Sequence, residues 1–211
     1  RFWSLVASGR WYKSQLNQSW MPPLRDVTGI NLKVVTQDAL LMAVGVHGCP
    51  ERLRIATNLH IYTDGSGMHD DDVAASWAFA VLSLDSSGQY AFHGLHCGCV
   101  VLDSAAPGYI GASSADCGSA EISAQAQAYL WLLQADLPCV LSVVIHYDST
   151  FAAGTIEGDM VTSTNTAVLE LTRGCLAILR SKILVCSEWV RGHSGDPWIE
   201  LADSACSWAK V

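Results

Sequence analysis

Four carboxylates and one histidine are the residues of this 211-residue chain whose types and positions suggest chemistry. Asp64 ends a stretch in which apolar and polar residues alternate, and a glycine-rich turn follows it, which is typical of a strand with a side chain at its exposed end. Asp148 likewise follows the β-branched run Val140–Tyr147, which is typical of a buried strand. Glu121 and Asp203 lie in segments of helical composition, Glu121 in the first turn of its segment.

These carboxylates predict a metal site if the strands that end in Asp64 and Asp148 lie side by side. Four carboxylates at one edge of a sheet repel one another unless cations neutralise them. Carboxylate oxygens are hard ligands, which favour Mg²⁺ or Mn²⁺ over Zn²⁺. We therefore expect two Mg²⁺ ions, with Mn²⁺ able to substitute, and the metal ligands Asp64, Glu121, Asp148 and Asp203.

Each of these residues also has an ordinary explanation when it is taken alone. Asp64 fits a simple Asp-Gly turn, the helix dipole favours Glu121 near a helix start, and Asp203 fits a solvated mid-helix acid. His193 fits an ordinary loop histidine. The run Asp70–Asp72 also resembles a metal site, but polar turns between strands commonly hold solvated acids, so we expect it to be solvated.

A second cluster of possible ligands lies within seven residues: His93, His96, Cys97 and Cys99. Structural zinc sites usually combine two ligand pairs that are a dozen or more residues apart, and this sequence lacks the second pair. We therefore interpret the cluster as part of a strand pair with small buried thiols. The eight cysteines lack the spacing of a disulfide framework, so reduced thiols are expected.

The elements that must position the carboxylates follow one another regularly after residue 58. We predict strands over 59–64, 76–84, 90–102, 140–147 and 183–189, and helices over 119–134, 165–179 and 197–209. Short turns make the first three strands an antiparallel meander, and the last two strands alternate with helices. The predicted fold class is α/β, with a five-stranded mixed sheet of three antiparallel strands and then two parallel strands, flanked by helices.

Residues 1–57 differ from the rest of the chain because they are rich in Trp and lack a clean helical or strand period. One helix is predicted there, over Thr36–Val44, with Thr36 as its cap. We interpret residues 1–57 as a basic upstream extension or linker packed partly on the main domain, which covers residues 58–211.

Charge is distributed unevenly along the chain, whose net charge is −8. Residues 1–57 hold seven basic and three acidic residues, whereas residues 58–211 hold five basic and seventeen acidic residues. Such an acidic domain repels a phosphate backbone unless cations intervene. No apolar run reaches the roughly 18 to 20 residues of a membrane span, and the N-terminus lacks a secretory signal pattern. We expect an intracellular protein, cytoplasmic or nuclear, that is not secreted and has no membrane partner.

Four fragments resemble, in order and local context, the ribonuclease H family of the cellular and retroelement type: Thr63–Ser66, Ala120–Glu121, Tyr147–Ser149 and Val190–Asp203. In the last fragment, His193 and Asp203 stand ten residues apart within a Gly-His-x-Gly and Glu-x-Ala-Asp pattern. The resemblance covers about residues 59–209. It implies a ribonuclease H-like fold and metal-dependent hydrolysis of the RNA strand of RNA–DNA hybrids.

The resemblance also implies a role for each residue of the predicted catalytic set. Asp64 is the expected bridging ligand of the two ions, and Glu121 and Asp148 complete their shells. Asp203 is expected to bind the ion that activates water. His193, between glycines, is a candidate for proton transfer or product release.

Substrate contacts are expected at four small residues, Gly65, Ser66, Gly118 and Ser119, which would meet the 2′-hydroxyls of the RNA strand. The span 149–182 carries only three basic residues, so the basic protrusion that grips the hybrid in stand-alone family members is absent. With the basic leader, this resembles a ribonuclease H domain of a retrotransposon polyprotein. The implied partners are an RNA–DNA hybrid and a reverse transcriptase domain.

Two alternatives to this enzyme remain. One is a non-catalytic ribonuclease H-like module with a structural or nucleic-acid-binding role, whose usual mark is a missing carboxylate; none is missing here. The other is a transferase or integrase on the same fold, which would lack the final pair of His193 and Asp203.

Overall fold

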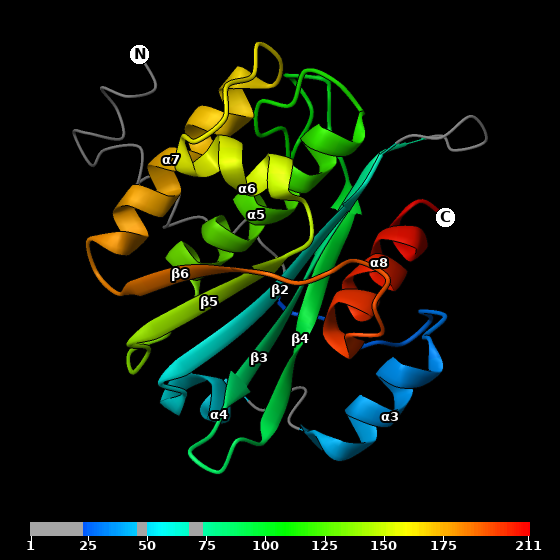
Figure 1. The fold of residues 1–211 in the computed structure, drawn as a ribbon, viewed down its shortest axis with the longest axis vertical. Coiled ribbons are helices and arrows are strands. Elements are labelled where there is room, and N and C mark those ends of the chain that lie inside the picture. The colour runs from blue at the N-terminus through cyan, green and yellow to red at the C-terminus, as the bar shows by residue number, and fades with distance from the viewer. Residues whose placement is uncertain (1–22, 46–49, 68–73) are drawn as a thin grey trace.

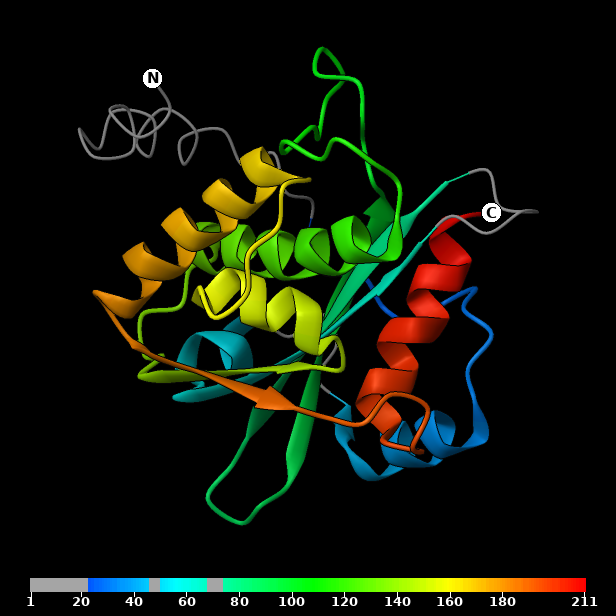
Figure 2. The same ribbon diagram turned by 45° about the horizontal axis from the view of Figure 1, so that its top comes forward.

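The computed structural model describes residues 23–45, 50–67 and 74–211, and its centre is a mixed sheet with helices on both faces (Figure 1 and Figure 2). The strands are β1 (Val44–Gly45), β2 (Asn58–Ser66), β3 (Ser76–Leu84), β4 (Tyr90–Cys99), β5 (Ser142–Tyr147) and β6 (Leu184–Trp189). The helices are α3 (Val34–Met42), α4 (Pro50–Ile55), α5 (Cys117–Gln134), α6 (Thr150–Glu157), α7 (Thr166–Arg180) and α8 (Pro197–Ala209).

The strand order is β1-β4-β3-β2-β5-β6. Strands β2, β3 and β4 are antiparallel neighbours, whereas β5 runs parallel to β2 and β6 runs parallel to β5. The predicted α/β class and the five-stranded arrangement are confirmed. The two-residue strand β1, which was not predicted, pairs in parallel with β4 at the edge of the sheet.

Apolar side chains alternate along the strands, so each face of the sheet has its own core. Leu59 and Ile61 of β2 pack with α5 and α7 on one face, and Tyr62 packs with α8 on the other. Helix α3 lies against α8 on that second face (Figure 1). Asp64 is on the same face of β2 as Tyr62, and the strand continues for two residues beyond it to Ser66.

Side-chain caps fix where the two helices with site residues begin. Asp116 Oδ1 accepts a hydrogen bond from the Ser119 N–H at 2.7 Å, so α5 begins at Cys117, two residues earlier than predicted. Glu121 therefore lies in the second turn of α5, and its predicted place in the first turn was wrong. Asp196 caps α8, which begins at Pro197 as predicted.

Two other helices differ from the sequence analysis. Helix α3 begins at Val34 and ends before β1, and Thr36 does not cap it. The Thr36 side chain is fully buried inside the helix and donates a hydrogen bond to the Pro197 carbonyl at 3.0 Å, because a contact to α8 outweighs its capping preference. Helix α6 was not predicted, although the Ser149 cap at its start and Gly158 in the left-handed region at its end are recognisable signals.

The described part of the upstream region is fastened to the sheet and to α8. The backbone of Arg25 exchanges two hydrogen bonds of 2.9 Å with Leu95, and the Arg25 guanidinium lies over the Trp208 ring at 3.7 Å. The division at residue 57 stays a prediction. None of the described helices is long and apolar enough to cross a membrane.

The cluster of His93, His96, Cys97 and Cys99 is divided between the two faces of the sheet. His96 lies beside Phe79 on the α5 face, whereas Cys97 belongs to the core under α8. The seven cysteines among the described residues are free thiols. The run Asp70–Asp72 lies outside the described residues.

A close approach of two backbones joins β2 to α5. A Cβ atom on Gly65 would lie 2.2 Å from the Glu121 nitrogen and 2.3 Å from the Ala120 carbonyl carbon, so the position accepts only glycine. The strand end that carries Asp64 and the helix turn that carries Glu121 meet at this point.

We predict that Gly65→Ala destabilises the fold by at least about 2 kcal/mol, because the clash is with backbone that cannot rotate away. Thermal unfolding measures the effect. Gly154→Ala is the control, since its nearest neighbours are side-chain atoms of the half-exposed Met160; it should stay within about 1 kcal/mol of the wild type. Equal stability of the two variants would contradict the close approach.

Candidate metal centre

Parallel pairing of β2 and β5 brings Asp64 and Asp148 to one edge of the sheet. The register pairs Tyr62 with His146, so the two aspartates follow at equivalent positions two residues further along. Glu121 reaches the same place from α5. One carboxylate oxygen from each of the three residues lies within 4.8 Å of the others.

Asp64 and Glu121 are buried, and Glu121 and Asp148 each have an oxygen without a partner. The exposed fraction of Asp64 is 8% and that of Glu121 is 9%. Glu121 Oε2 and Asp148 Oδ1 are buried and have no hydrogen-bond partner among the described residues. Buried polar atoms without partners are costly, and a cation bound here would satisfy both of them.

The three carboxylates open into a cleft of about 280 Å³. Its lining also includes His193 and Asp203, so all five residues of the predicted catalytic set meet in one cleft. The full lining is Asp64, Gly65, Ser66, Gly67, Cys117, Glu121, Asp148, His193, Ile199 and Asp203.

Electrostatics in the cleft oppose the charged forms of the carboxylates. Burial, and then the charges of Asp148 and Asp203, raise the pKa of Asp64 to about 7. Burial and the charges of Asp64 and Asp148 raise the pKa of Glu121 well above its ordinary value. Burial also raises the pKa of Asp148. The arrangement is one that a divalent cation would stabilise.

His193 lies on an exposed loop that passes closely over Asp148. Its φ of +52° is in the left-handed region, which is uncommon for a residue other than glycine. A Cβ atom on the preceding residue, Gly192, would lie 2.4 Å from Asp148 Oδ2. The Ser194 hydroxyl closes the turn by donating to the Arg191 carbonyl at 2.6 Å.

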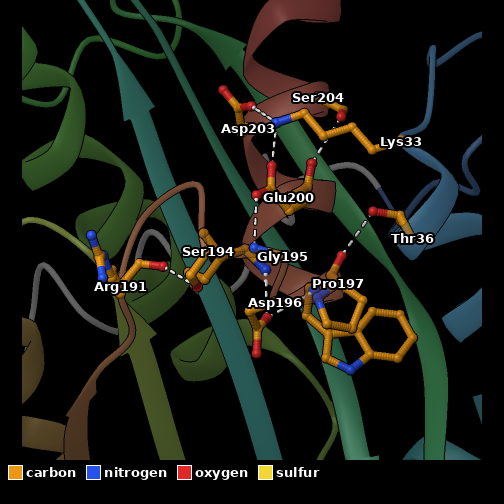
Figure 3. Close-up of polar contacts among 12 residues, drawn as sticks. Lys33, Thr36, Arg191, Ser194, Gly195, Asp196, Pro197, Glu200, Asp203 and Ser204 are labelled. Atoms are coloured by element: carbon orange, nitrogen blue, oxygen red, sulfur yellow. Dashed lines mark hydrogen bonds and ion pairs between the residues drawn. The ribbon is translucent and has the colours of Figure 1, made fainter.

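A second group of possible ligands, formed by His193, Glu200 and Asp203, lies beside the first. Glu200 and Asp203 are three residues apart on α8 and therefore share a face. Figure 3 shows the Lys33 side chain reaching from the N-terminal end of α3 to both carboxylates. Its ammonium donates to Glu200 Oε2, and to Asp203 Oδ2 at 2.7 Å.

Lys33 and Glu200 were not among the predicted site residues. The spacing of Glu200 and Asp203 on one helix was a usable signal for Glu200. Nothing in the sequence pointed to Lys33, which lies 170 positions from Asp203.

Two of the four predicted substrate-contact residues line the cleft and two do not. Gly65 and Ser66 line the cleft. Gly118 and Ser119 are not among the described residues that line it, and the buried Ser119 hydroxyl donates to the Ser114 carbonyl at 2.5 Å. The contacts of all four residues with a substrate stay predictions.

Comparison with solved structures identifies the fold. Ribonuclease H1 from the halophilic archaeon Halobacterium salinarum matches with a TM-score of 0.52 and 14% identity, over 72% of this chain and 96% of that chain. The N-terminal ribonuclease H domain of a Mycobacterium tuberculosis protein matches with a TM-score of 0.51 and 16% identity, over 73% and 96%. This is the ribonuclease H fold.

The ribonuclease H domain of prototype foamy virus also matches, with a TM-score of 0.50 and 14% identity, over 74% of this chain and 95% of that chain. No family model and no curated protein sequence matches the chain. At these identities the similarity shows the ribonuclease H fold alone. The feature of this chain that bears on activity is the acidic group of Asp64, Glu121 and Asp148.

The raised pKa of Asp64 predicts a pH-dependent stability in metal-free protein. Between its ordinary value of 3.8 and about 7, the folded state retains a proton that the unfolded state has lost, so this residue destabilises the fold increasingly as pH rises through that window. In EDTA at pH 8, Asp64→Asn should therefore be more stable than the wild type by at least about 1 kcal/mol, or roughly 2–4 °C in Tm. The difference should shrink towards pH 4.

Metal should reverse this order. Mn²⁺ should stabilise the wild type more at pH 8 than at pH 5, because it binds the deprotonated carboxylates, and should stabilise Asp64→Asn little. Thermal unfolding with and without Mn²⁺ measures both effects. The control is Asp159→Asn, which neutralises an exposed acid outside the cleft. Equal stabilisation of wild type and Asp64→Asn by Mn²⁺ would rule out a metal centre at Asp64.

Proposed function

We propose that this protein is a metal-dependent endonuclease that hydrolyses the RNA strand of RNA–DNA hybrids. The observation that carries the proposal is the convergence of Asp64, Glu121 and Asp148 within 4.8 Å, with two buried oxygens unsatisfied, on the ribonuclease H fold. Carboxylate oxygens at this density suit Mg²⁺, and Mn²⁺ as its substitute. Two such ions, when bound, would activate water and stabilise the leaving oxygen.

The residues that line the cleft would have different roles in the reaction. Asp64, Glu121 and Asp148 would hold the metal, because one carboxylate oxygen of each lies within 4.8 Å of the others. His193, exposed at the rim beside Asp148, is placed to accept or deliver a proton from solvent. Asp203 lines the same cleft and completes the proposed ligand set.

Binding of the hybrid needs positive charge, and two of the three basic residues near α6 and α7 are engaged within the protein. Arg173 donates to the Thr155 carbonyl, and Arg180 forms two hydrogen bonds of 2.7 Å with Glu157, so both guanidiniums serve internal contacts. We propose that the upstream region and a reverse transcriptase domain supply the positive charge that binds the hybrid. The structural match to the foamy virus domain is consistent with a retroelement origin.

A non-catalytic hybrid-binding module is the second candidate. The observation in its favour is the ion pair of Asp203 with Lys33, because a carboxylate engaged by an ammonium is less available to a metal ion. Cleavage and binding assays on the same protein separate the two functions.

We predict that Asp148→Asn lowers cleavage of a labelled RNA–DNA hybrid in Mg²⁺ by at least about 100-fold, since even the loss of a residue that only orients a metal ligand costs 10- to 100-fold. The fold should survive, because burial already disfavours the charged form of Asp148. Asp159→Asn, with the same charge change on the surface, should cut as the wild type does.

Equal cutting by Asp148→Asn and the wild type would overturn the assignment of the active site. Binding of the hybrid without cutting by any of the three proteins would instead favour the non-catalytic module.

A further inference from the structure

One carboxylate of the cleft, Asp203, is already paired with a cation of the protein's own. The Lys33 ammonium lies between Glu200 and Asp203 and donates to both carboxylates. The Glu200 side chain is only 6% exposed, whereas the Asp203 and Lys33 side chains are 28% and 43% exposed, so the ion pair has one buried partner and lies at the edge of the protein surface. Glu200 Oε1 is engaged as well, because it accepts from the Gly195 N–H at 3.4 Å (Figure 3).

The two carboxylates that Lys33 contacts are the ones that could bind a second metal ion. Together with His193 they form the second ligand group, and Asp203 lies close enough to the first group to act on Asp64 and Asp148 electrostatically. An ammonium and a divalent ion compete for the same oxygens, because both need carboxylate lone pairs at short range. The lysine therefore competes with a second metal ion for Asp203 Oδ2.

Contacts on both sides of Lys33 hold it in this place. On one side, Arg25 pairs with Leu95 through the backbone and stacks on Trp208. On the other side, the buried Thr36 hydroxyl donates to the Pro197 carbonyl at the start of α8. The ammonium is thus delivered by a segment that is attached at several points to the helix that carries Glu200 and Asp203.

We infer that Lys33 is a positioning residue that occupies the second cation position of the cleft and so sets the number of divalent ions bound. Asp64, Glu121 and Asp148 bind one ion tightly, and a second ion binds at Asp203 only by displacing the ammonium. The inference rests on the proposed function, because it takes the first three carboxylates as metal ligands.

A purely structural role makes a different prediction. If Lys33 only fastens α3 to α8, its loss lowers stability but leaves the number and affinity of bound ions unchanged. The number of bound ions is therefore the readout that distinguishes the two roles.

The experiment is a Mn²⁺ titration of the full chain, followed by electron paramagnetic resonance of free Mn²⁺ and by calorimetry, without substrate. Lys33→Met keeps most of the length of the side chain and removes its charge, and Lys33→Arg keeps the charge. The wild type should bind one ion tightly, and the second ion should bind at least tenfold more tightly to Lys33→Met than to the wild type. Lys33→Arg should behave as the wild type does.

A further variant keeps the test independent of how Lys33→Met folds. Asp203→Asn in the otherwise unchanged chain should alter the affinity for the first ion by less than about threefold, because Lys33 already engages Asp203. A tenfold or larger loss would show that Asp203 binds the first ion in spite of Lys33 and would overturn the inference.

The failures of the two proposals are distinguishable. One tight ion in every protein, with no gain in Lys33→Met, would overturn the role of Lys33 and leave the metal centre standing. No Mn²⁺ binding by any of the proteins would overturn the metal centre, and the role of Lys33 with it.

Discussion

Mutual repulsion of buried carboxylates is the constraint on which the rest of this structure depends. Asp64, Glu121 and Asp148 are drawn together by elements that are stable for other reasons: two parallel strands in register and a helix packed on the sheet. The apolar cores on both faces supply the free energy that keeps the like charges close, since burial of apolar side chains is the dominant favourable term in folding. The cleft is therefore a place where the fold is locally less stable than it would be with neutral residues, which is common where a protein binds a charged ligand.

Close packing holds the carboxylates near one another. Gly65 lets the backbone of α5 approach β2 at Glu121, and Gly192 lets the loop that carries His193 pass directly over the Asp148 carboxylate. The repulsion between the carboxylates can be reduced by binding protons or by binding cations. The raised pKa values of Asp64 and Glu121 show that protons bind more readily than usual, and the two groups of possible metal ligands could bind cations. Above the pKa of about 7 of Asp64, a cation becomes the more effective of the two, because Asp64 then loses its proton.

The sequence predicted the parts of this site that depend on local pattern. Alternation and β-branched runs located the strands that end in Asp64 and Asp148, and the sheet order follows from the connections between them, so the convergence of the catalytic set could be expected. One error came from a tertiary contact that overrides local preference: Thr36 bonds to the start of α8 instead of capping α3. A second error was local, because the cap at Asp116 starts α5 two residues earlier and leaves Glu121 in the second turn. The contact of Lys33 with Asp203 could not be predicted, because an ion pair across 170 positions leaves no periodicity or spacing to detect.

The ion pair of Lys33 with Glu200 and Asp203 joins the basic upstream region to the acidic main domain. The acidic excess of residues 58–211 and the basic excess of residues 1–57 are complementary, and Lys33 is a point where one neutralises the other in the described structure. Positive charge from the upstream region reaches the cleft through a segment that is anchored on both sides of the lysine, so its ammonium acts at a fixed place rather than as a diffuse field. A fixed ammonium contributes one charge where a divalent ion contributes two. The cleft therefore remains acidic after Lys33 has bound, and its remaining attraction for cations is concentrated on Asp64, Glu121 and Asp148.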